Sequence, residues 1–443
     1  MKLAVSVLGR EVATLDQVGD FKSVLTYHQN AAADDFVSLT MPVRTESYAW
    51  DDTLPPILQM NLPEGYLLQV LQEQFGPHVG GSPAALLSVI GRNMVGRLQV
   101  AAPGAALDEP AQPIELADVL RGDNSELAFA ALVRQHATSG VSGVVPKFLD
   151  AQQASAAPLA AHNKASLVTR SHIIKGSSQQ LPFVALNESL CMQVASRLIP
   201  TAKTELSDDG QALVVHRFDV DQNGQPQRGM EDFCALLGLR PAAKYDTTWE
   251  RVARAVRDHV PGSQRLETFR LLATTLLLTY ALRNADCHAK NLALIYTSRA
   301  DVQLSPAYDL LTTVVYAGYQ HNPPGIEFMG KKTWTPGKNL HRFIATTFGI
   351  GPKEQSLMLE AISDAVADVG PLVREAMLTH PGFADIGKRM LVAWAEGIHG
   401  LRDKRVYALG DWHAGTAFDG FSPAPKLSSP KARIGQSSLL GKR

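Results

Sequence analysis

The sequence predicts an α+β fold in which a small N-terminal α+β unit precedes a bilobal body with a mostly helical second lobe. Short strand-like segments alternate with helical segments as far as about residue 230, and helical periodicity dominates beyond that point. Residues 103–114 have the composition of a linker. These observations divide the chain into units 1–102, 103–228 and 229–410 and a tail, 411–443.

The first unit, residues 1–102, begins with a predicted β-hairpin in which LAVSVL and EVATL flank a turn at Gly9 and Arg10. The strand-like segments VLTYH and FVSLT follow. SPAALLSVI predicts a helix, because a serine stands at the cap position and a proline in the first turn. GRNMVGRLQVA is expected to form a turn and a closing strand.

The second unit, residues 103–228, combines a glycine-containing turn, two strands and a helix. The turn segment is SGVSGVVPK, and the strand SLVTRSHIIK after it ends in Lys175. The helix LNESLCMQVASRLI carries Glu188, and ALVVHRFDV is the next strand. A strand lysine followed by a helix glutamate resembles the small lobe of a kinase. The tail, rich in Gly, Ser, Pro, Lys and Arg, is expected to be mobile.

The composition is that of an ordinary soluble globular protein, with 45% hydrophobic and 19% charged residues among 443. A net charge of −1 argues against extensive nucleic-acid binding by this chain alone. The apolar start MKLAVSVLGRE is too short for a secretory signal. The apolar run at 271–282 falls short of the roughly 20 residues of a membrane span. We therefore expect a buried helix there, a cytoplasmic location and no membrane partner.

Three widely spaced cysteines, Cys191, Cys234 and Cys287, fit neither a metal-binding pattern nor a disulfide framework. We expect reduced and mostly buried thiols. Cys287 follows Asp286 directly, so either a nucleophile or a small core residue would fit that position, and the core residue is favoured.

The stretch from NADCHAKNLALIY to LSPAYD carries the predicted chemistry. Asp286 is followed five residues later by Asn291, and Asp309 ends a short extended segment beyond it. Phosphoryl transfer needs a carboxylate that accepts the hydroxyl proton, and an amide oxygen and a second carboxylate that hold magnesium against the triphosphate. Protein kinases use these groups in the same order. We predict that Asp286 is the general base and that Asn291 and Asp309 bind magnesium.

Turn or capping chemistry would explain each of these three residues alone, and their coupled spacing is what favours function. In the same loop, His288 and Lys290 are candidate catalytic residues. His288 is expected to hold the loop in place, and Lys290 is either a cation for the transferring phosphoryl group or a solvated lysine. Lys175, paired with Glu188, is predicted to reach the α- and β-phosphates of ATP, although a surface lysine is the alternative.

Two further segments give weaker signals for ATP binding. Gly140 and Gly143 would let backbone amides approach phosphate oxygens, and Lys147 would add charge. A plain hairpin turn is the stronger alternative there, and only the position upstream of the strand lysine favours a phosphate loop. His216 and Phe218 lie either in a hinge that pairs with adenine or in an ordinary edge strand, and the sequence does not choose between them.

Together these segments resemble the HipA family of bacterial toxin kinases. The matching segments are LLSVIGRNMVGRLQV, SGVSGVVPKF, SHIIK, LNES, VHRFD, EDFCALLGL, KYD, NADCHAKNLAL and LSPAYDLL. They follow the order of the family as far as about residue 400, and ADCHAKN with the later YD is the most specific element. The N-terminal unit suggests a chain of the full-length type.

The resemblance implies a bilobal, protein-kinase-like fold related to phosphoinositide kinases, with ATP and Mg²⁺ as cofactors. It implies a serine/threonine protein kinase that acts as the toxin of a toxin–antitoxin pair. The implied substrate is an aminoacyl-tRNA synthetase, typically the glutamyl enzyme. The implied partner is a HipB-like helix-turn-helix antitoxin, and operator DNA would be bound only through that complex.

The chain departs from the family in two places. The family's loop carries a serine that autophosphorylates and switches the kinase off, but a gap-free match from Lys147 puts Gly140 at that position. Ser139 and Ser142 are the nearby candidates for autophosphorylation. In the hinge, His216 stands where an acidic residue is common, and this change is compatible with backbone pairing to adenine.

Two other functions stay open on the sequence. Asp286, His288 and Asn291 also resemble the catalytic loop of phosphoinositide kinases, which would make the protein a small-molecule or lipid kinase. The near-neutral charge makes a lipid acceptor the weaker choice. The other function is a catalytically silent corepressor of a helix-turn-helix antitoxin, and the intact set of predicted catalytic residues argues against it.

Overall fold

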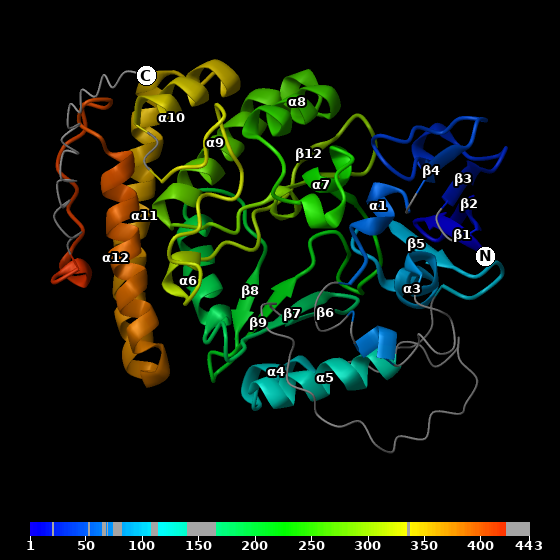
Figure 1. Ribbon diagram of the computed structural model, residues 1–443, viewed down its shortest axis with the longest axis horizontal. Helices are drawn as coiled ribbons and strands as arrows, with labels where there is room; N and C mark the ends of the chain where they lie inside the picture. The colour runs from blue at the N-terminus through cyan, green and yellow to red at the C-terminus, as the bar shows by residue number, and fades with distance from the viewer. Residues whose placement is uncertain are drawn as a thin grey trace, which may run out of the picture.

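The computed structural model describes residues 1–19, 22–51, 54–63, 68, 70–73, 82–107, 114–139, 165–334 and 337–421, without the side chains of 137–139 and 165. A five-stranded sheet lies at one end of the molecule and the long helices α11 and α12 lie at the other (Figure 1). The predicted glycine-containing turn from residue 140 and residues 422–443 of the predicted mobile tail lie outside the described residues. For residues 411–421 the prediction of a mobile tail is wrong, because Ala417 and Phe418 are buried in the core against α11 and α12.

The N-terminal unit is built on an antiparallel sheet in the order β4-β3-β2-β1-β5. Its elements are β1 (Lys2–Val7), β2 (Arg10–Val18), β3 (Lys22–Tyr27), β4 (Tyr48–Asp51), β5 (Leu98–Ala101), α1 (Pro56–Gln59) and α3 (Pro83–Ile90). The predicted hairpin is confirmed, with Leu8 and Gly9 both at positive φ in the turn between β1 and β2. The predicted cap of α3 is also confirmed, because the Ser82 hydroxyl accepts from the Ala85 amide at 3.1 Å.

The strand predicted for FVSLT is wrong. Residues 36–40 form a turn next to an isolated bridge between Ser38 and Met41. Phe36 and Leu39 belong to the core of the helical lobe, whereas Val37 belongs to the core of the N-terminal unit. The apolar alternation that predicted a strand therefore reflects burial between two units and not a pleated sheet.

The second unit contains an antiparallel sheet in the order β6-β7-β9-β8. Its elements are α4 (Leu116–Arg121), α5 (Glu126–Ser139), β6 (Ala165–Val168), β7 (His172–Gly176), α6 (Val184–Ser196), β8 (Thr204–Leu206) and β9 (Ala212–His216). Val214 of β9 shares a core with Phe129 of α5, whereas its neighbours Leu213 and Val215 share a core with α6. Since alternate residues of a strand face opposite sides, α5 and α6 cover the two faces of this sheet.

The predicted helical lobe is confirmed. Its helices are α7 (Phe233–Leu236), α8 (Trp249–His259), α9 (Arg265–Ala281), α10 (Gly337–Phe343), α11 (Pro352–Thr379) and α12 (Ala384–Leu401). A small sheet of β10 (Gly229–Asp232), β11 (Ala293–Tyr296) and β12 (Gln303–Leu304) accompanies them, in the order β10-β11-β12.

The buried helix expected at 271–282 is confirmed within and just beyond α9, where every residue from Leu272 to Leu282 is buried. The hydroxyls of Thr274, Thr275 and Thr279 donate to carbonyl oxygens four residues earlier, at 2.9–3.0 Å. These bonds satisfy the threonines inside an apolar core, so α9 can support the loop that follows it.

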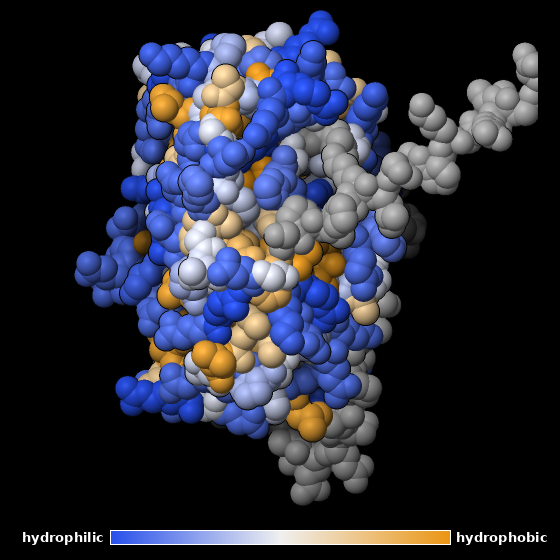
Figure 2. All heavy atoms as spheres, turned by 90° about the vertical axis from the view of Figure 1, so that its left-hand side faces the viewer, coloured by the Kyte–Doolittle hydropathy of each residue, from blue (hydrophilic) through white to orange (hydrophobic). Residues whose placement is uncertain are grey.

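No helix in the described ranges is long and apolar enough to cross a membrane. The end of the molecule formed by α11 and α12 is mostly hydrophilic, with small separate apolar areas (Figure 2). Two of the exposed apolar side chains are Leu357 and Leu378 of α11. Isolated exposed leucines of this kind are normal on a protein surface.

Candidate active site

The loop that carries Asp286 begins where α9 ends. Arg283 adopts positive φ directly after the helix, and Asn284 is buried. The Asn284 side chain accepts from the Asp286 amide at 3.0 Å, and the Ala285 amide donates to the Thr313 hydroxyl at 2.7 Å. Local hydrogen bonds and a contact with a distant segment thus fix the position of Asp286.

Asp286 and Asn291, which the spacing couples, are hydrogen-bonded in the structure. Nδ2 of Asn291 donates to the backbone oxygen of Asp286 at 2.7 Å. The bond closes the loop across its five-residue span, so the side chain of Asn291 has a fixed orientation relative to Asp286. The Asp286 carboxylate accepts a short hydrogen bond from the hydroxyl of Tyr245.

The Lys175 ammonium lies between two carboxylates from distant parts of the chain. Its Nζ is 2.6 Å from Oε1 of Glu188 and 2.8 Å from Oδ1 of Asp309. Lys175 comes from β7, Glu188 from α6, and Asp309 from the segment after β12, so the contact joins both lobes. The three side chains are only 14%, 2% and 17% exposed, and one cation here offsets the cost of burying two anions.

The segment that carries Asp309 is held from two sides. Thr201 and Ala307 form a parallel bridge, and the Tyr308 hydroxyl donates to the Lys290 backbone oxygen at 2.9 Å. Asp309 itself adopts positive φ, a conformation that aspartate tolerates better than most residues. The Tyr308 ring lies 6.1 Å from that of Phe218, so the predicted hinge and the predicted metal segment are neighbours.

Asn187, next to Glu188 in α6, holds the chain just beyond Asp309. Its Nδ2 donates to the Thr312 carbonyl at 2.9 Å, and its Oδ1 accepts from the Thr312 amide at 2.9 Å. Nε1 of Trp394 in α12 donates to the Thr312 hydroxyl at 2.7 Å. Asn187, Thr312 and Trp394 are fully buried, so the lobes are joined here by satisfied polar groups.

The His216 side chain contacts the two strands, β7 and β8, that flank β9 in the sheet. Its Nε2 lies 2.5 Å from Oε1 of Glu205, and its ring packs edge-on against His172 with 4.6 Å between centroids. The hydrogen bond with His216, followed by that with Lys203, lowers the pKa of Glu205. Any contact with adenine at this position would therefore come from the backbone.

For the remaining predicted residues the structure shows contacts that do not involve the predicted role, or does not describe the side chain. His288 is buried and packs edge-on against Tyr245, with 5.0 Å between ring centroids. Lys290 is held through its carbonyl oxygen. Ser139 is the last residue of α5, and its side chain is not described. The predicted loop residues Gly140, Ser142, Gly143 and Lys147 lie outside the described residues.

Cys287 is a core residue. It is buried in the same core as Cys191 of α6, a core that α6 shares with the helical lobe, and burial raises the pKa of each thiol to about 12. Nucleophilic cysteines need a readily formed thiolate. The nucleophile alternative for Cys287 therefore does not suit this position.

Asn291 and Asp309 offer the amide and carboxylate oxygens that Mg²⁺ prefers. Because Nδ2 of Asn291 is used by the Asp286 carbonyl, its side-chain oxygen is the atom left for a cation. In the described part of the chain, no group of three or more His, Cys, Asp or Glu could hold an ion. The pair thus suits a metal that takes its other ligands from phosphate and water.

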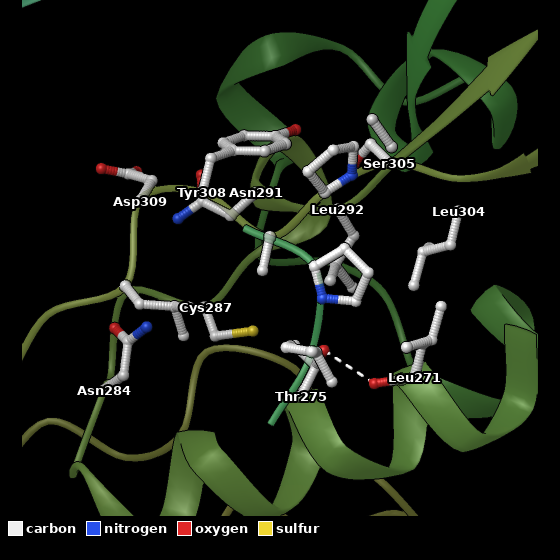
Figure 3. Close-up of a pocket in the computed structure, with 16 residues that line it drawn as sticks. Leu271, Thr275, Asn284, Cys287, Asn291, Leu292, Leu304, Ser305, Tyr308 and Asp309 are labelled. Atoms are coloured by element: carbon white, nitrogen blue, oxygen red, sulfur yellow. Dashed lines mark hydrogen bonds between the residues drawn. The ribbon is translucent and has the colours of Figure 1, made fainter. Parts of the chain in front are cut away.

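An apolar hollow lies next to these two residues (Figure 3). Leu271 and Thr275 of α9 form one side, and the segment from Leu304 to Leu310 forms another. The Thr275 hydroxyl donates to the Leu271 carbonyl, so it does not need a hydrogen-bond acceptor inside the hollow. Asp309 belongs to the lysine cluster and lines the hollow, whereas Lys175 and His216 are not among the described residues that line it, so the hollow adjoins the cluster at Asp309.

Sequence reasoning missed the role of Tyr245. This tyrosine lies between α7 and α8, 41 residues before the aspartate that it contacts. It is held by its neighbours, since Lys332 Nζ donates to its backbone oxygen at 3.0 Å. No local pattern marks a tyrosine in a polar loop as the partner of a distant carboxylate, although it falls in one of the segments that resemble the HipA family.

Comparison with known families covers most of the chain. A model described as the HipA N-terminal domain matches residues 3–101, and one described as the HipA-like C-terminal domain matches residues 139–370. The second match alone spans more than half of the chain. It includes every predicted site residue that lies in the helical lobe and in the sheet around Lys175.

Two similar curated proteins come from Sinorhizobium fredii. The protein named "Putative kinase Y4dM" is 27% identical over 340 residues, which are 71% of this chain and 78% of its own. "Putative kinase Y4mE" is 26% identical over 303 residues, which are 63% and 69% of the two chains.

Among solved structures, HipA of the Shewanella oneidensis toxin–antitoxin complex of HipA, HipB and operator DNA is similar throughout. Its TM-score is 0.62 at 17% identity, over 90% of this chain and 99% of that chain. At this identity the likeness shows a common fold, and the predicted bilobal fold is confirmed by it.

Proposed function

The chain belongs to the HipA family, and on that basis we propose that it is an ATP- and Mg²⁺-dependent serine/threonine protein kinase that acts as the toxin of a toxin–antitoxin pair. The proposed units are the N-terminal unit at 1–102, a nucleotide-binding lobe at 103–228, a catalytic lobe at 229–410 and a tail at 411–443. The kinase names of the two relatives from Sinorhizobium fredii support this assignment.

The contact of Lys175 with Glu188 and Asp309 carries the proposal. In active kinases a strand lysine pairs with a helix glutamate and reaches the phosphates of ATP, and a separate aspartate nearby binds the metal. Here Lys175 pairs with Glu188 and lies beside Asp309. A structural ion pair would need only one carboxylate, which Glu188 supplies. The second carboxylate belongs to Asp309, the residue predicted to bind magnesium. The cluster therefore supports nucleotide binding over a purely structural role.

In the proposed reaction, Asp286 accepts a hydrogen bond from the hydroxyl of a protein serine or threonine. The hydroxyl oxygen forms a bond to the γ-phosphorus as the bond to the β-phosphate oxygen breaks, ADP leaves, and the hydroxyl proton passes to Asp286. Lys175 offsets phosphate charge, and Asn291 and Asp309 would hold magnesium. When bound, the metal neutralises charge that develops on the phosphate oxygens.

The resemblance to the family favours an aminoacyl-tRNA synthetase, in particular the glutamyl enzyme, as the protein substrate, and this assignment is part of the proposal. Ser139 and Ser142 are the proposed sites of self-phosphorylation. Both lie within the match to the HipA-like C-terminal domain, close to its first residue. A cytoplasmic location follows from a substrate of translation.

A HipB-like helix-turn-helix antitoxin is the proposed partner, with operator DNA bound through the complex. The fold supports this, because the similar HipA from Shewanella oneidensis was solved with HipB and its operator DNA. The net charge of −1 agrees with a chain that does not bind DNA extensively on its own.

The test is incubation of the purified protein with γ-labelled ATP and magnesium, first alone and then with glutamyl-tRNA synthetase. Label on a serine or threonine of either protein would support the proposal. Label that enters only lipid or metabolite fractions of a cell extract would make the protein a small-molecule kinase. Absence of nucleotide binding, with operator repression retained in a complex, would make it a silent corepressor.

Replacing Tyr245 with phenylalanine is expected to lower kcat by about three- to tenfold, as the loss of one hydrogen bond to a charged group would. The hydroxyl orients the Asp286 carboxylate, and the ring still packs against His288 without it. The measurement is kcat and the KM for the protein substrate. A rise in kcat would show instead that the tyrosine hydroxyl competes with the substrate hydroxyl for Asp286.

A further inference from the structure

The side-chain contacts of the predicted hinge, residues 216–218, and of Asp219 after it alternate along the chain. His216 contacts Glu205 and Phe218 contacts Tyr308, both within the two lobes. The residues between and after them, Arg217 and Asp219, contact the N-terminal unit. This alternation continues past the end of β9 at His216 into a bend at residues 218 and 219. As a result, the same short segment forms part of the proposed adenine site and also contacts the N-terminal unit.

Arg217 and Asp219 form a buried ion pair. Arg217 donates to the Asp219 carboxylate from NH2 at 2.6 Å and from Nε at 3.1 Å, and both side chains are 2% exposed. A buried pair with two parallel hydrogen bonds has a defined geometry. The backbone between the two residues includes Phe218, so the pair restrains the hinge itself.

Each partner of this pair also bonds to the segment 93–97 of the N-terminal unit. Arg217 donates from NH2 to the Met94 carbonyl at 2.7 Å and from NH1 to Oδ1 of Asn93 at 3.1 Å. Oδ2 of Asp219 accepts from the Gly96 amide at 2.7 Å. Nδ2 of Asn93 donates in turn to the Val168 carbonyl at 3.1 Å.

Gly96 is required for this close approach. It has φ of +95°, and a side-chain carbon there would lie 3.1 Å from the Met230 backbone nitrogen in β10. A larger residue would be strained in conformation and would push against the first strand of the helical lobe. The segment 93–97 therefore lies against both lobes of the predicted kinase body.

Arg97 extends the same segment into the helical lobe. It donates from NH1 to the Thr297 carbonyl at 3.0 Å and from NH2 to the Phe36 carbonyl at 2.7 Å. Its guanidinium lies 4.1 Å from the Phe36 ring centroid and 5.1 Å from that of Tyr296. Arginine held over aromatic faces with little exposure to water gives a strong attachment.

A second attachment to the helical lobe is centred on Glu231 of β10. Its carboxylate accepts from the Ser38 hydroxyl at 2.7 Å, the Leu39 amide at 2.6 Å and the Tyr296 hydroxyl at 2.5 Å. Ser38 and Leu39 belong to the N-terminal unit and Tyr296 to β11. The N-terminal unit is thus bonded to the hinge on one side and to β10 and β11 on the other.

We propose that residues 93–97 of the N-terminal unit act as a clamp that, through Arg217 and Asp219, positions the hinge, residues 216–218, for nucleotide binding. The proposal rests on the proposed function in that it takes residues 216–218 as the adenine site. Asn93 is then a positioning residue that acts through Arg217. Without these contacts the hinge backbone would adopt more conformations. Only some of them would bind the nucleotide, so the apparent affinity for ATP would fall.

The test replaces Asn93 with alanine, which removes the hydrogen bonds to Arg217 and Val168. The matched control is Gln59→Ala, because the buried Gln59 amide donates at 2.6 Å to the Leu54 carbonyl inside the N-terminal unit. For Asn93→Ala, the KM for ATP should rise by about three- to tenfold with kcat within about twofold, as loss of two ordinary hydrogen bonds outside the reacting groups predicts. The control should leave the KM for ATP unchanged.

Amide hydrogen exchange of the peptide that covers residues 213–220, measured without nucleotide, gives a second readout that needs no kinase activity. Exchange should become faster in Asn93→Ala than in the control. Unchanged exchange in a folded variant would overturn the clamp, whatever the protein phosphorylates. If wild-type protein binds ATP and Asn93→Ala has the same KM, the clamp is wrong and the proposed function stands. If wild type binds no nucleotide, both fail.

Discussion

Replacing Asp286 with asparagine is expected to reduce phosphoryl transfer by about 10²- to 10⁴-fold, the contribution of a positioned general base. Asparagine has nearly the same shape, and the backbone oxygen that accepts from Asn291 is unchanged. The loop should therefore keep its conformation, and the Kd for ATP should stay within about threefold because no contact of Lys175 is altered. Initial rates with labelled ATP and calorimetric titration of nucleotide measure the two quantities.

The control for this variant is Asp385→Asn, which removes the same charge from an exposed position at the start of α12. It should retain wild-type rates. Transfer by Asp286→Asn at a rate close to that of the wild type would exclude Asp286 as the base. A parallel loss of nucleotide binding would mean that the substitution had disturbed the loop instead.

Lys175→Met is expected to lower the free energy of unfolding by about 3–5 kcal/mol, as removal of one partner from a buried ion pair does. Methionine has a similar length but no charge, so Glu188 and Asp309 would be left close together without a cation. The same change should weaken ATP binding by tenfold or more, since about 1.4 kcal/mol of lost attraction to the phosphates is enough for that. Urea denaturation and nucleotide titration measure the two effects.

Lys203→Met provides a matched control. Lys203 Nζ is 3.1 Å from Glu205, but its side chain is 70% exposed. Removal of such a surface pair should cost less than about 1 kcal/mol. Equal losses of stability in the two variants would show that the Lys175 cluster behaves as an ordinary surface pair, and unchanged ATP binding by Lys175→Met would remove it from the proposed site.

The sequence could predict the parts of the site that depend on local order. Asp286 and Asn291 are five residues apart, so a single short loop is enough to bring them together, and the sequence shows that spacing directly. Lys175 and Glu188 are 13 residues apart, on a strand and the helix that follows it, so their approach depends on one strand–helix unit. The apolar run of α9 likewise carried enough periodicity and length to identify a buried helix.

The rest depends on contacts between distant segments. FVSLT was predicted to be a strand because burial between two units imitates the alternation of a sheet. The hydrogen bond from Tyr245 to Asp286 joins residues 41 positions apart, and the hydrogen bond from Arg217 to Asn93 joins residues 124 positions apart. Propensity and periodicity carry no information on such pairs, because each partner is polar and would suit a solvated loop equally well.

The hydrogen bond from Trp394 to Thr312 has a consequence for how the protein is made. The segment just beyond Asp309 is bonded to α12, which leaves the ribosome last among the described α-helices. During synthesis β1, β2 and β3, which pair with their neighbours in sequence, can fold early, and β5 joins β1 once residues 98–101 have been added. The two hydrogen bonds from Asn187 to the Thr312 backbone can form before α12 has been synthesised, whereas the Trp394 bond cannot, so a growing or prematurely released chain holds this segment by fewer contacts than the finished protein.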